Sequence, residues 1–209
     1  MSTTRKPTPR PYRMVRRLEQ SEATRARLLD AAWQRFSTLP YESVRLSDVA
    51  ADAGVTVQTL HTRFGTKDGL LTAALQRWME EQGRRRVHAR VGDVDDVVRV
   101  LYDNYDDQGE VGLRITAQED RIPVIRTYID VGRRWQRAWV AQVLEPFLTA
   151  APPEERGDLH EALIVALDIY TWRLLRVDIG HPTEDARRIV AGMIRSLVRG
   201  SGARRPRRR

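Results

Sequence analysis

The chain has 209 residues, enough for one or two domains with a buried core, and it contains no cysteine, which excludes a disulfide framework and a thiolate metal site. It has no apolar run of about 18 residues or more, and its basic start is not followed by an apolar stretch, so we expect neither a membrane span nor a secretory signal. The formal net charge of +8 suggests nucleic acid as a partner, and the overall profile is that of a soluble cytoplasmic protein.

The positive charge is concentrated at the two ends of the chain. Residues 1–20 and residues 201–209 each carry a net charge of +5, so the part between them is close to neutral. Both ends are poor in apolar residues, which predicts a disordered basic arm and a disordered Arg-rich tail. Two interpretations of the arm stay open: it follows DNA phosphates or enters the minor groove, or it only keeps the protein soluble.

The first predicted helix covers residues 22–38. Leu28, Ala32 and Phe36 recur every four residues in it and form one apolar side. A turn at residues 40–43 separates this helix from the next one. The first helix is expected to pack behind the DNA-reading unit and support it.

The next segment, residues 46–64, has the pattern of a helix-turn-helix. Its first helix carries an apolar stripe, and Gly54 ends that helix because glycine accepts the left-handed backbone without a Cβ clash. Thr56 is the expected N-cap of the second helix, and Val55 is expected to pack on Leu60 as a hydrophobic staple. Two short helices joined by a tight turn result.

The outward side of the second helix carries uncharged hydrogen-bonding groups. At about 100° per residue, Leu60 and Phe64 point inward while Gln58 and Thr62 point away. A helix in the DNA major groove needs such groups, because glutamine can bond an adenine edge and the methyl group of Val57 or Thr62 can meet a thymine methyl. The pattern predicts a DNA-reading helix; the alternative is a small polar helical hairpin.

The stretch from Thr24 to Leu71 resembles the N-terminal DNA-binding domain of the TetR family of transcriptional regulators. The resemblance covers about a quarter of the chain and lies in the order and spacing of its residues. It implies a helix-turn-helix DNA-binding domain over residues 21–66. The residues that carry it are Leu28-Leu29-Asp30-Ala31-Ala32, Phe36, Asp48-Val49-Ala50, Ala53-Gly54-Val55-Thr56, Thr59-Leu60, Phe64 and Lys67.

Three positions depart from the family pattern. His61 stands where the family usually has a tyrosine that touches phosphate, and Arg63 replaces a usual aromatic residue. Arg45 stands where a threonine usually caps the helix, so that cap is open and Arg45 becomes a candidate phosphate contact. Lys67 matches a lysine that contacts the DNA backbone in the family. The residues predicted to contact DNA are Arg45, Ser47, Thr56, Val57, Gln58, Thr59, His61, Thr62 and Lys67.

Residues 67–92 are predicted to form a helix that connects the DNA-binding domain to the rest of the chain, with Thr66 as its cap. The charge run over residues 83–90 is interpreted as a solvated face of this helix. Gly92 and Asp93 end the pattern, which places a domain boundary near residue 92.

Residues 93–200 show helical periods and no alternating strand pattern. The predicted fold is therefore all-α, with the N-terminal helix-turn-helix domain followed by a larger helical ligand-binding and dimerisation bundle. The helices are expected over residues 94–105, 122–147 and 154–179 and between Pro182 and Gly200, with a weaker segment from Gly109 to Asp120.

The last two predicted helices are more apolar than a monomer of this size needs. We therefore expect a two-fold homodimer through residues 155–199; the alternative is one monomeric core. The resemblance implies a four-helix dimer interface there, and two reading helices one DNA turn apart match a near-palindromic operator. The predicted interface residues are Leu163, Tyr170, Leu174, Ile189, Val190, Met193, Ile194 and Leu197.

Aromatic residues are concentrated in the segments around the predicted bundle interior. The resemblance implies an inducer cavity there, and a mostly apolar pocket suits a small ligand, although aromatic residues at helical spacing also build plain core. Asp168 and Arg173 are either a buried pair that orients a ligand or a structural salt bridge. The residues predicted to line the pocket are Tyr102, Tyr105, Tyr128, Trp135, Trp139, Tyr170 and Trp172.

Catalytic motifs are missing from the sequence. The 4 histidines have no metal spacing, no glycine-rich phosphate loop follows a strand and no nucleophile elbow is present, so we predict no enzyme, metal or cofactor.

We predict a homodimeric regulator that binds double-stranded DNA specifically, a repressor released by an unidentified small-molecule ligand. The alternatives are a helical ligand-binding or interaction module that no longer reads sequence, and a nonspecific DNA-coating protein driven by its tails, which salt dependence would reveal.

Overall fold

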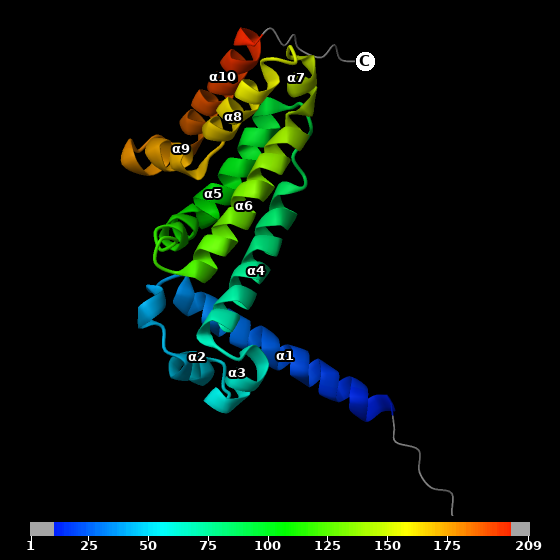
Figure 1. The fold of residues 1–209 in the computed structure, drawn as a ribbon, viewed down its shortest axis with the longest axis vertical. Coiled ribbons are helices and arrows are strands. Elements are labelled where there is room, and N and C mark those ends of the chain that lie inside the picture. The colour runs from blue at the N-terminus through cyan, green and yellow to red at the C-terminus, as the bar shows by residue number, and fades with distance from the viewer. Residues whose placement is uncertain (1–10, 202–209) are drawn as a thin grey trace, which may run out of the picture. The chain divides into compact units, whose positions relative to one another are not determined.

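The computed structural model describes residues 11–201, and every regular element in that range is a helix (Figure 1). The predicted all-α class is confirmed. The chain divides into two compact units, Met1–Leu75 and Gln76–Arg209, and the division falls inside α4 (Lys67–Arg86). Residues 1–10 of the predicted arm and residues 202–209 of the predicted tail lie outside the described residues.

The N-terminal unit is built on the predicted helix-turn-helix. Its elements are α1 (Pro11–Phe36), the 3-10 turn η1 (Tyr41–Ser43), α2 (Leu46–Asp52), α3 (Val57–Phe64) and the first part of α4. α1 packs on α2, and α2 packs on α3. Their apolar stripes meet in one core, in which Leu28, Val49 and Leu60 are 0% exposed. Burial of these side chains holds the two short helices in place, since helices of this length are not stable alone.

α1 is longer than the sequence pattern indicates. It begins at Pro11 rather than near Glu22, so the prediction of a disordered arm is wrong for residues 11–20. Proline suits the first turn of a helix because its missing N–H has no helical partner there, and the residues that follow are mostly good helix formers.

The turns around α3 have the predicted caps. Gly54 has a φ of +65°, the left-handed conformation that ends α2. The hydroxyl of Thr56 accepts from the Thr59 amide at 3.2 Å, and the hydroxyl of Thr66 accepts from the Gly69 amide at 3.0 Å. These bonds satisfy N–H groups that have no partner within the helix, so both helix starts are fixed.

The second unit is a helical bundle. It contains the rest of α4, then α5 (Val94–Thr116), α6 (Pro123–Val143), α7 (Glu145–Ala150), α8 (Arg156–Ala166), α9 (Ile169–Arg173), the π-helical turn η2 (Leu174–Asp178) and α10 (Thr183–Gly200). α5 packs against α6, α9 and α10, and α8 packs against α6, α7 and α10 (Figure 1). The centre of the core consists of residues that are 0% exposed: Val97, Leu101, Val140, Leu144, Leu163, Leu167, Ala186, Val190 and Ile194.

α5 runs through the segment that was expected to be weak. A Cβ built on Gly109 would lie 2.6 Å from Cζ3 of Trp172, and a Cβ on Gly112 would lie 3.1 Å from Cδ1 of Ile169. Both glycines therefore let α9 approach α5 closely. They serve packing and do not interrupt the helix.

Two predicted long helices are divided, so these predictions are wrong. The helix expected over 122–147 ends at Val143, and Pro146 lies in the first turn of α7, where it has no N–H to continue the previous helix. The helix expected over 154–179 stops at Ala166. The Asp168 carboxylate accepts from the Tyr170 amide at 2.8 Å, which caps α9 as a new helix.

Among the described helices, none is long and apolar enough to span a membrane. Within residues 11–201, the structure places no group of three or more His, Cys, Asp or Glu side chains where they could hold a metal ion.

Candidate DNA-binding surface and ligand pocket

α3 exposes the polar side that its periodicity predicts. Leu60 is fully buried, while Val57, Gln58 and Thr62 are exposed. The Thr62 hydroxyl donates to the Gln58 carbonyl at 2.8 Å, so its proton is used within the helix. The Gln58 carboxamide makes no hydrogen bond to another described residue. Both its donor and its acceptor are available to a base edge.

Thr56, Thr59 and His61 have partners within the turns of this unit. The hydroxyls of Thr56 and Thr59 lie 2.9 Å apart at the start of α3. Nδ1 of the exposed His61 lies 2.8 Å from the Gly65 carbonyl oxygen. Because a carbonyl only accepts, Nδ1 carries a proton, and Nε2 is left for an outside partner. A phosphate contact by His61 stays a prediction.

Lys67 is held at the first residue of α4 by an aromatic ring. Its Nζ lies 4.2 Å from the ring centroid of Tyr41, a residue that the sequence pattern did not single out. Burial and the Asp68 carboxylate, which accepts from the Tyr41 hydroxyl, raise the pKa of Tyr41 to about 12. Partial burial lowers the pKa of Lys67. The ammonium group is therefore oriented at a helix start, where an anion is favoured.

The start of α2 carries an exposed positive charge, that of Arg45. Arg45 is exposed and gives no side-chain cap to α2, as expected, while Ser47 bonds to Asp48 at 3.2 Å. The carboxylates of α2 are neutralised from α1, because Arg35 lies 2.6 Å from Asp52 and 3.4 Å from Asp48. The negative charge of α2 thus does not oppose an approaching phosphate backbone.

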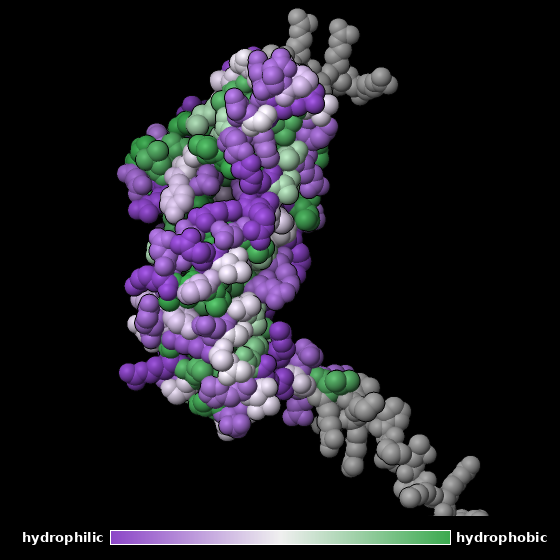
Figure 2. Space-filling view, in the orientation of Figure 1, coloured by the Kyte–Doolittle hydropathy of each residue, from purple (hydrophilic) through white to green (hydrophobic). Residues whose placement is uncertain are grey.

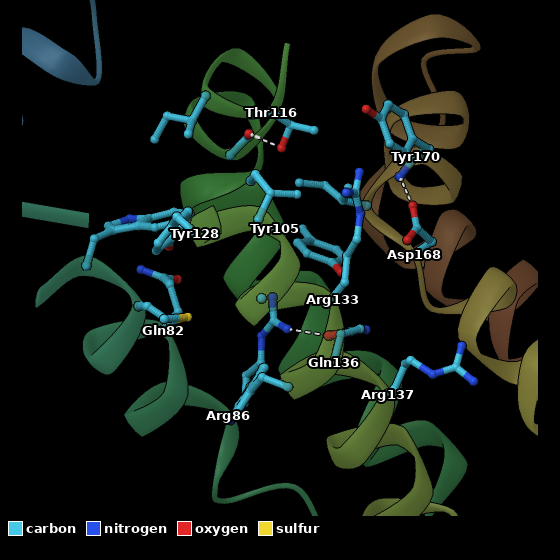
Figure 3. Close-up of a pocket in the computed structure, with 18 of the residues that line it drawn as sticks. Gln82, Arg86, Tyr105, Thr116, Tyr128, Arg133, Gln136, Arg137, Asp168 and Tyr170 are labelled. Carbon is cyan, nitrogen blue, oxygen red and sulfur yellow. Dashed lines mark hydrogen bonds between the residues drawn. The ribbon is translucent and has the colours of Figure 1, made fainter. Parts of the chain in front are cut away.

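A cavity of about 460 Å³ lies in the second unit, with walls from α4, α5, α6 and the segment of α8 and α9 (Figure 3). Four of the predicted residues line it: Tyr105, Tyr128, Trp135 and Tyr170. Lining residues that the sequence analysis did not identify include Trp78, Met79, Gln82, Ile115, Ile129 and Ile164. The size and the mostly apolar wall suit a small molecule.

Three predicted pocket residues belong to the core instead. Tyr102 is 1% exposed and lies among the side chains between α5 and its neighbours. Trp139 stacks on Trp135 at 6.4 Å between ring centroids and is itself 5% exposed. Trp172 donates from Nε1 to Asp106 at 2.8 Å. These three aromatic residues at helical spacing fill the bundle as plain core, the alternative to pocket lining.

The interpretation of residues 83–90 as a solvated face is wrong for Arg86. Arg86 is 8% exposed and lines the cavity. Its Nε and Nη2 donate to the Asn104 side-chain oxygen at 3.0 and 2.7 Å, and its Nη1 donates to the Gln136 side-chain oxygen at 2.7 Å. One signal could have found it: Trp78, Gln82 and Arg86 recur every four residues and share one side of α4.

The predicted pair of Asp168 and Arg173 does not form. Asp168 lines the cavity and caps α9, whereas Arg173 lies 3.5 Å from Asp178 at the end of η2. The division of the predicted helix after Ala166 separates the two side chains. Neither of the two interpretations of this pair is correct.

The predicted dimer residues are found in three environments. Leu163, Val190 and Ile194 are 0% exposed in the chain's own core, so they cannot contact a second copy directly. Ile189 and Leu197 are partly buried against that core. The exposed members are Tyr170 at 54%, Leu174 at 52% and Met193 at 40%.

The structure thus combines a helix-turn-helix that has a polar outer face with a second compact unit, a helical bundle that contains a cavity, and a helix-turn-helix of this kind is typical of DNA-binding proteins. Residues 28–74 match the family model described as bacterial regulatory proteins, tetR family. This match is confined to the N-terminal unit and confirms that this part of the chain resembles the TetR family.

Known proteins extend the comparison beyond this domain. The chain is 30% identical over 116 residues to the HTH-type transcriptional regulator CymR of Pseudomonas putida, covering 52% of this chain and 57% of CymR. It thus spans little more than half the length of that relative.

Solved structures agree on the fold over most of the chain. A tetR-family transcriptional regulator from Streptomyces coelicolor has a TM-score of 0.67 at 22% identity, covering 86% of this chain and 84% of its own. A transcriptional regulator from Saccharomonospora viridis in complex with choline has a TM-score of 0.62 at 23% identity, covering 84% and 96%. At these identities the likeness establishes the fold alone.

Proposed function

We propose that the protein is a homodimeric, sequence-specific transcriptional regulator, a repressor that leaves its operator when a small molecule binds in the second unit. The observation that carries the proposal is the exposed polar face of α3 on a TetR-family helix-turn-helix, where the Gln58 carboxamide is free. Gln58 reads a base edge, and Val57 and Thr62 add apolar contacts to it. The domain is positioned on the DNA phosphates by Arg45, Ser47, Thr56, Thr59, His61 and Lys67.

Ligand control acts through α4. The same helix carries Lys67 at its first residue and contributes Trp78, Gln82 and Arg86 to the cavity. A ligand that favours one conformation of this helix changes the separation of the two reading helices, and linkage requires operator DNA to weaken the ligand by the same factor. The structure of the choline complex of the Saccharomonospora viridis regulator supports a small-molecule site in this fold.

A second copy of the chain covers an apolar surface on the second unit. Figure 2 shows hydrophobic residues gathered over the region of α9. The exposed apolar residues of α8, α9, η2 and their surroundings are Val165, Tyr170, Leu174, Val177, Ile179 and Met193, each at least 40% exposed. We call these six residues the apolar patch. Such a patch is unusual on a monomer, and a two-fold contact through it produces the paired reading helices that a near-palindromic operator requires.

The deciding experiment selects binding sites from random duplex DNA at about 0.15 M salt. The wild-type chain is expected to yield a palindromic consensus, and Gln58→Ala is expected to lose information at one position in each half-site while the flanking positions persist. Exposed Gln34 on α1 supplies the control, since Gln34→Ala should leave the consensus unchanged. If DNA is retained without any consensus, and this retention vanishes as salt rises, the basic tails bind DNA nonspecifically.

A further inference from the structure

The cavity contains a buried cation that has no anion beside it. Arg86 is 8% exposed, and its hydrogen-bond acceptors are the neutral side-chain oxygens of Asn104 and Gln136. Among the described residues, no carboxylate lies within ion-pair distance of its guanidinium. The group has five N–H donors, of which three are used, so two remain.

Aromatic rings surround this guanidinium. Its central carbon lies 5.1 Å from the ring centroid of Tyr105, 5.2 Å from that of Trp135 and 5.9 Å from that of Trp139. Burial lowers the pKa of Arg86. Ring faces offset part of the cost of burying a cation, but they do not neutralise it, so a counter-ion is strongly favoured at this position.

The other two arginines of the cavity wall have carboxylate partners, and the one carboxylate of the wall within residues 11–201, Asp168, caps a helix. Arg133 lies 2.8 Å from Glu119, and Arg137 forms an ion pair with Glu161. The Asp168 carboxylate accepts from the Tyr170 amide at 2.8 Å. Asp168 is partly exposed to solvent, whereas Arg86 is buried, so Arg86 is the buried charge of the wall, among the residues described, that has no ion-pair partner.

We propose that this cavity binds a small carboxylic acid with an apolar body, and that its carboxylate pairs with Arg86. Figure 3 shows Arg86 extending from the end of α4 toward Gln136 and the side chains around the cavity. A carboxylate can take two N–H donors from one guanidinium, which matches the two that remain. The apolar body of the acid lies against Trp78, Tyr128, Ile129 and Ile164. That this acid is the regulatory ligand rests on the proposed function.

The same charge excludes another class of ligand. The Saccharomonospora viridis structure contains choline, a quaternary ammonium ion. In this chain a cation seated among the aromatic rings would lie beside the buried guanidinium of Arg86, so binding there would add repulsion to the cost of desolvation. The aromatic wall alone would suit either ligand, and the buried charge of Arg86 favours the acid over the cation at this end of the cavity.

The test compares acids with their uncharged amides by calorimetry on the full chain. The probes are 2-naphthoate with 2-naphthamide, 4-phenylbutanoate with 4-phenylbutanamide, and choline. At least one acid should bind the wild-type chain at least about tenfold more tightly than its amide, and choline should bind more weakly than both. In Arg86→Gln the acid and the amide should bind about equally.

Arg133→Gln is the matched control, because it removes a cavity-wall arginine with the same change in net charge but leaves Arg86 in place. It should keep the preference for the acid. Circular dichroism verifies that each variant folds, and the wild-type comparison stands without any variant. Equal binding of acid and amide, tighter binding of choline, or no binding of either acid at millimolar concentration would overturn the inference.

Operator binding by the same preparations separates this inference from the proposed function. An acid that binds through Arg86 but leaves the selected DNA site bound would refute ligand release while the ligand class holds. A chain that binds its operator but has no preference for acids would refute the ligand class while the regulator stands. An acid that binds and releases the operator supports both.

Discussion

Gly109 illustrates how one missing side chain sets the packing of two helices. A Cβ at this position would lie 2.6 Å from Cζ3 and 2.7 Å from Cη2 of Trp172. The indole cannot easily retreat, because its Nε1 donates to Asp106 at 2.8 Å. We expect Gly109→Ala to destabilise the second unit by about 1–3 kcal/mol, measured by denaturant unfolding of the full chain. Gly157→Ala, whose Cβ would meet nothing within 4 Å, should not destabilise it; equal losses in both would refute this account.

Sequence periodicity could identify some functional residues and not others. The outward direction of Gln58 follows from helix geometry alone, because the turn and the cap at Thr56 define the register. Arg84, Arg85 and Arg86 are chemically identical neighbours, and only packing distinguishes them: Arg84 and Arg85 reach carboxylates on the surface, while Arg86 enters the cavity. The spacing of Trp78, Gln82 and Arg86 shows that Arg86 shares their side of α4, but it does not show that this side is buried, since the partners of Arg86 come from other helices.

At the scale of elements, the ion pair between α1 and α2 makes their contact depend on pH. A hydrogen bond from Arg35 lowers the pKa of Asp52. Because the folded pKa is the lower one, the pair stabilises the unit above the ordinary aspartate pKa of about 4, and this contribution is lost as pH falls through the folded value. We expect Asp52→Asn to increase hydrogen exchange of the α2 amides near neutral pH, compared with wild type at the same pH.

The difference between the two proteins should disappear on the acid side of pH 4, where wild-type Asp52 becomes protonated. Glu80→Gln is the control, since Glu80 is exposed and forms no ion pair with another described residue. A difference in α2 exchange that persists unchanged into acid would show that the carboxylate packs there without its charge mattering.

Helix boundaries show where element prediction fails. The sequence identified the helix-turn-helix because Gly54 and Thr56 give local signals at the turn itself. The break after Ala166 has a signal of the same kind in Asp168, but it lies inside an apolar run that favours continuing the helix. Whether Asp168 caps a new helix depends on the packing of α9 against α5, which no window of adjacent residues contains.

At the scale of the whole molecule, the sequence predicted an interface but could not separate it from the core. α10 is apolar along one stripe, and burial inside the chain's own bundle uses Val190 and Ile194 of that stripe. Core and interface have the same composition in one sequence, so the choice between them requires the positions of α5 and α8. Of the apolar patch, three members lie on α9 and η2, namely Tyr170, Leu174 and Val177, and the other three lie on α8, on α10 and just after η2.

The apolar patch therefore gives a direct test of the dimer. Leu174 is 52% exposed, and a glutamate there would place two charges in a two-fold contact without disturbing the core. We expect Leu174→Glu to elute as a monomer in chromatography with light scattering, where the wild-type chain elutes as a dimer. Operator affinity should fall by about 100-fold, because the two reading helices no longer bind as a linked pair.

Val91→Glu is the control, since Val91 is a 55% exposed apolar residue outside the patch, and this variant should keep both the dimer mass and the operator affinity. A wild-type monomer, or a dimer that withstands Leu174→Glu, would mean that the patch has another role and that paired reading helices are held together elsewhere or not at all.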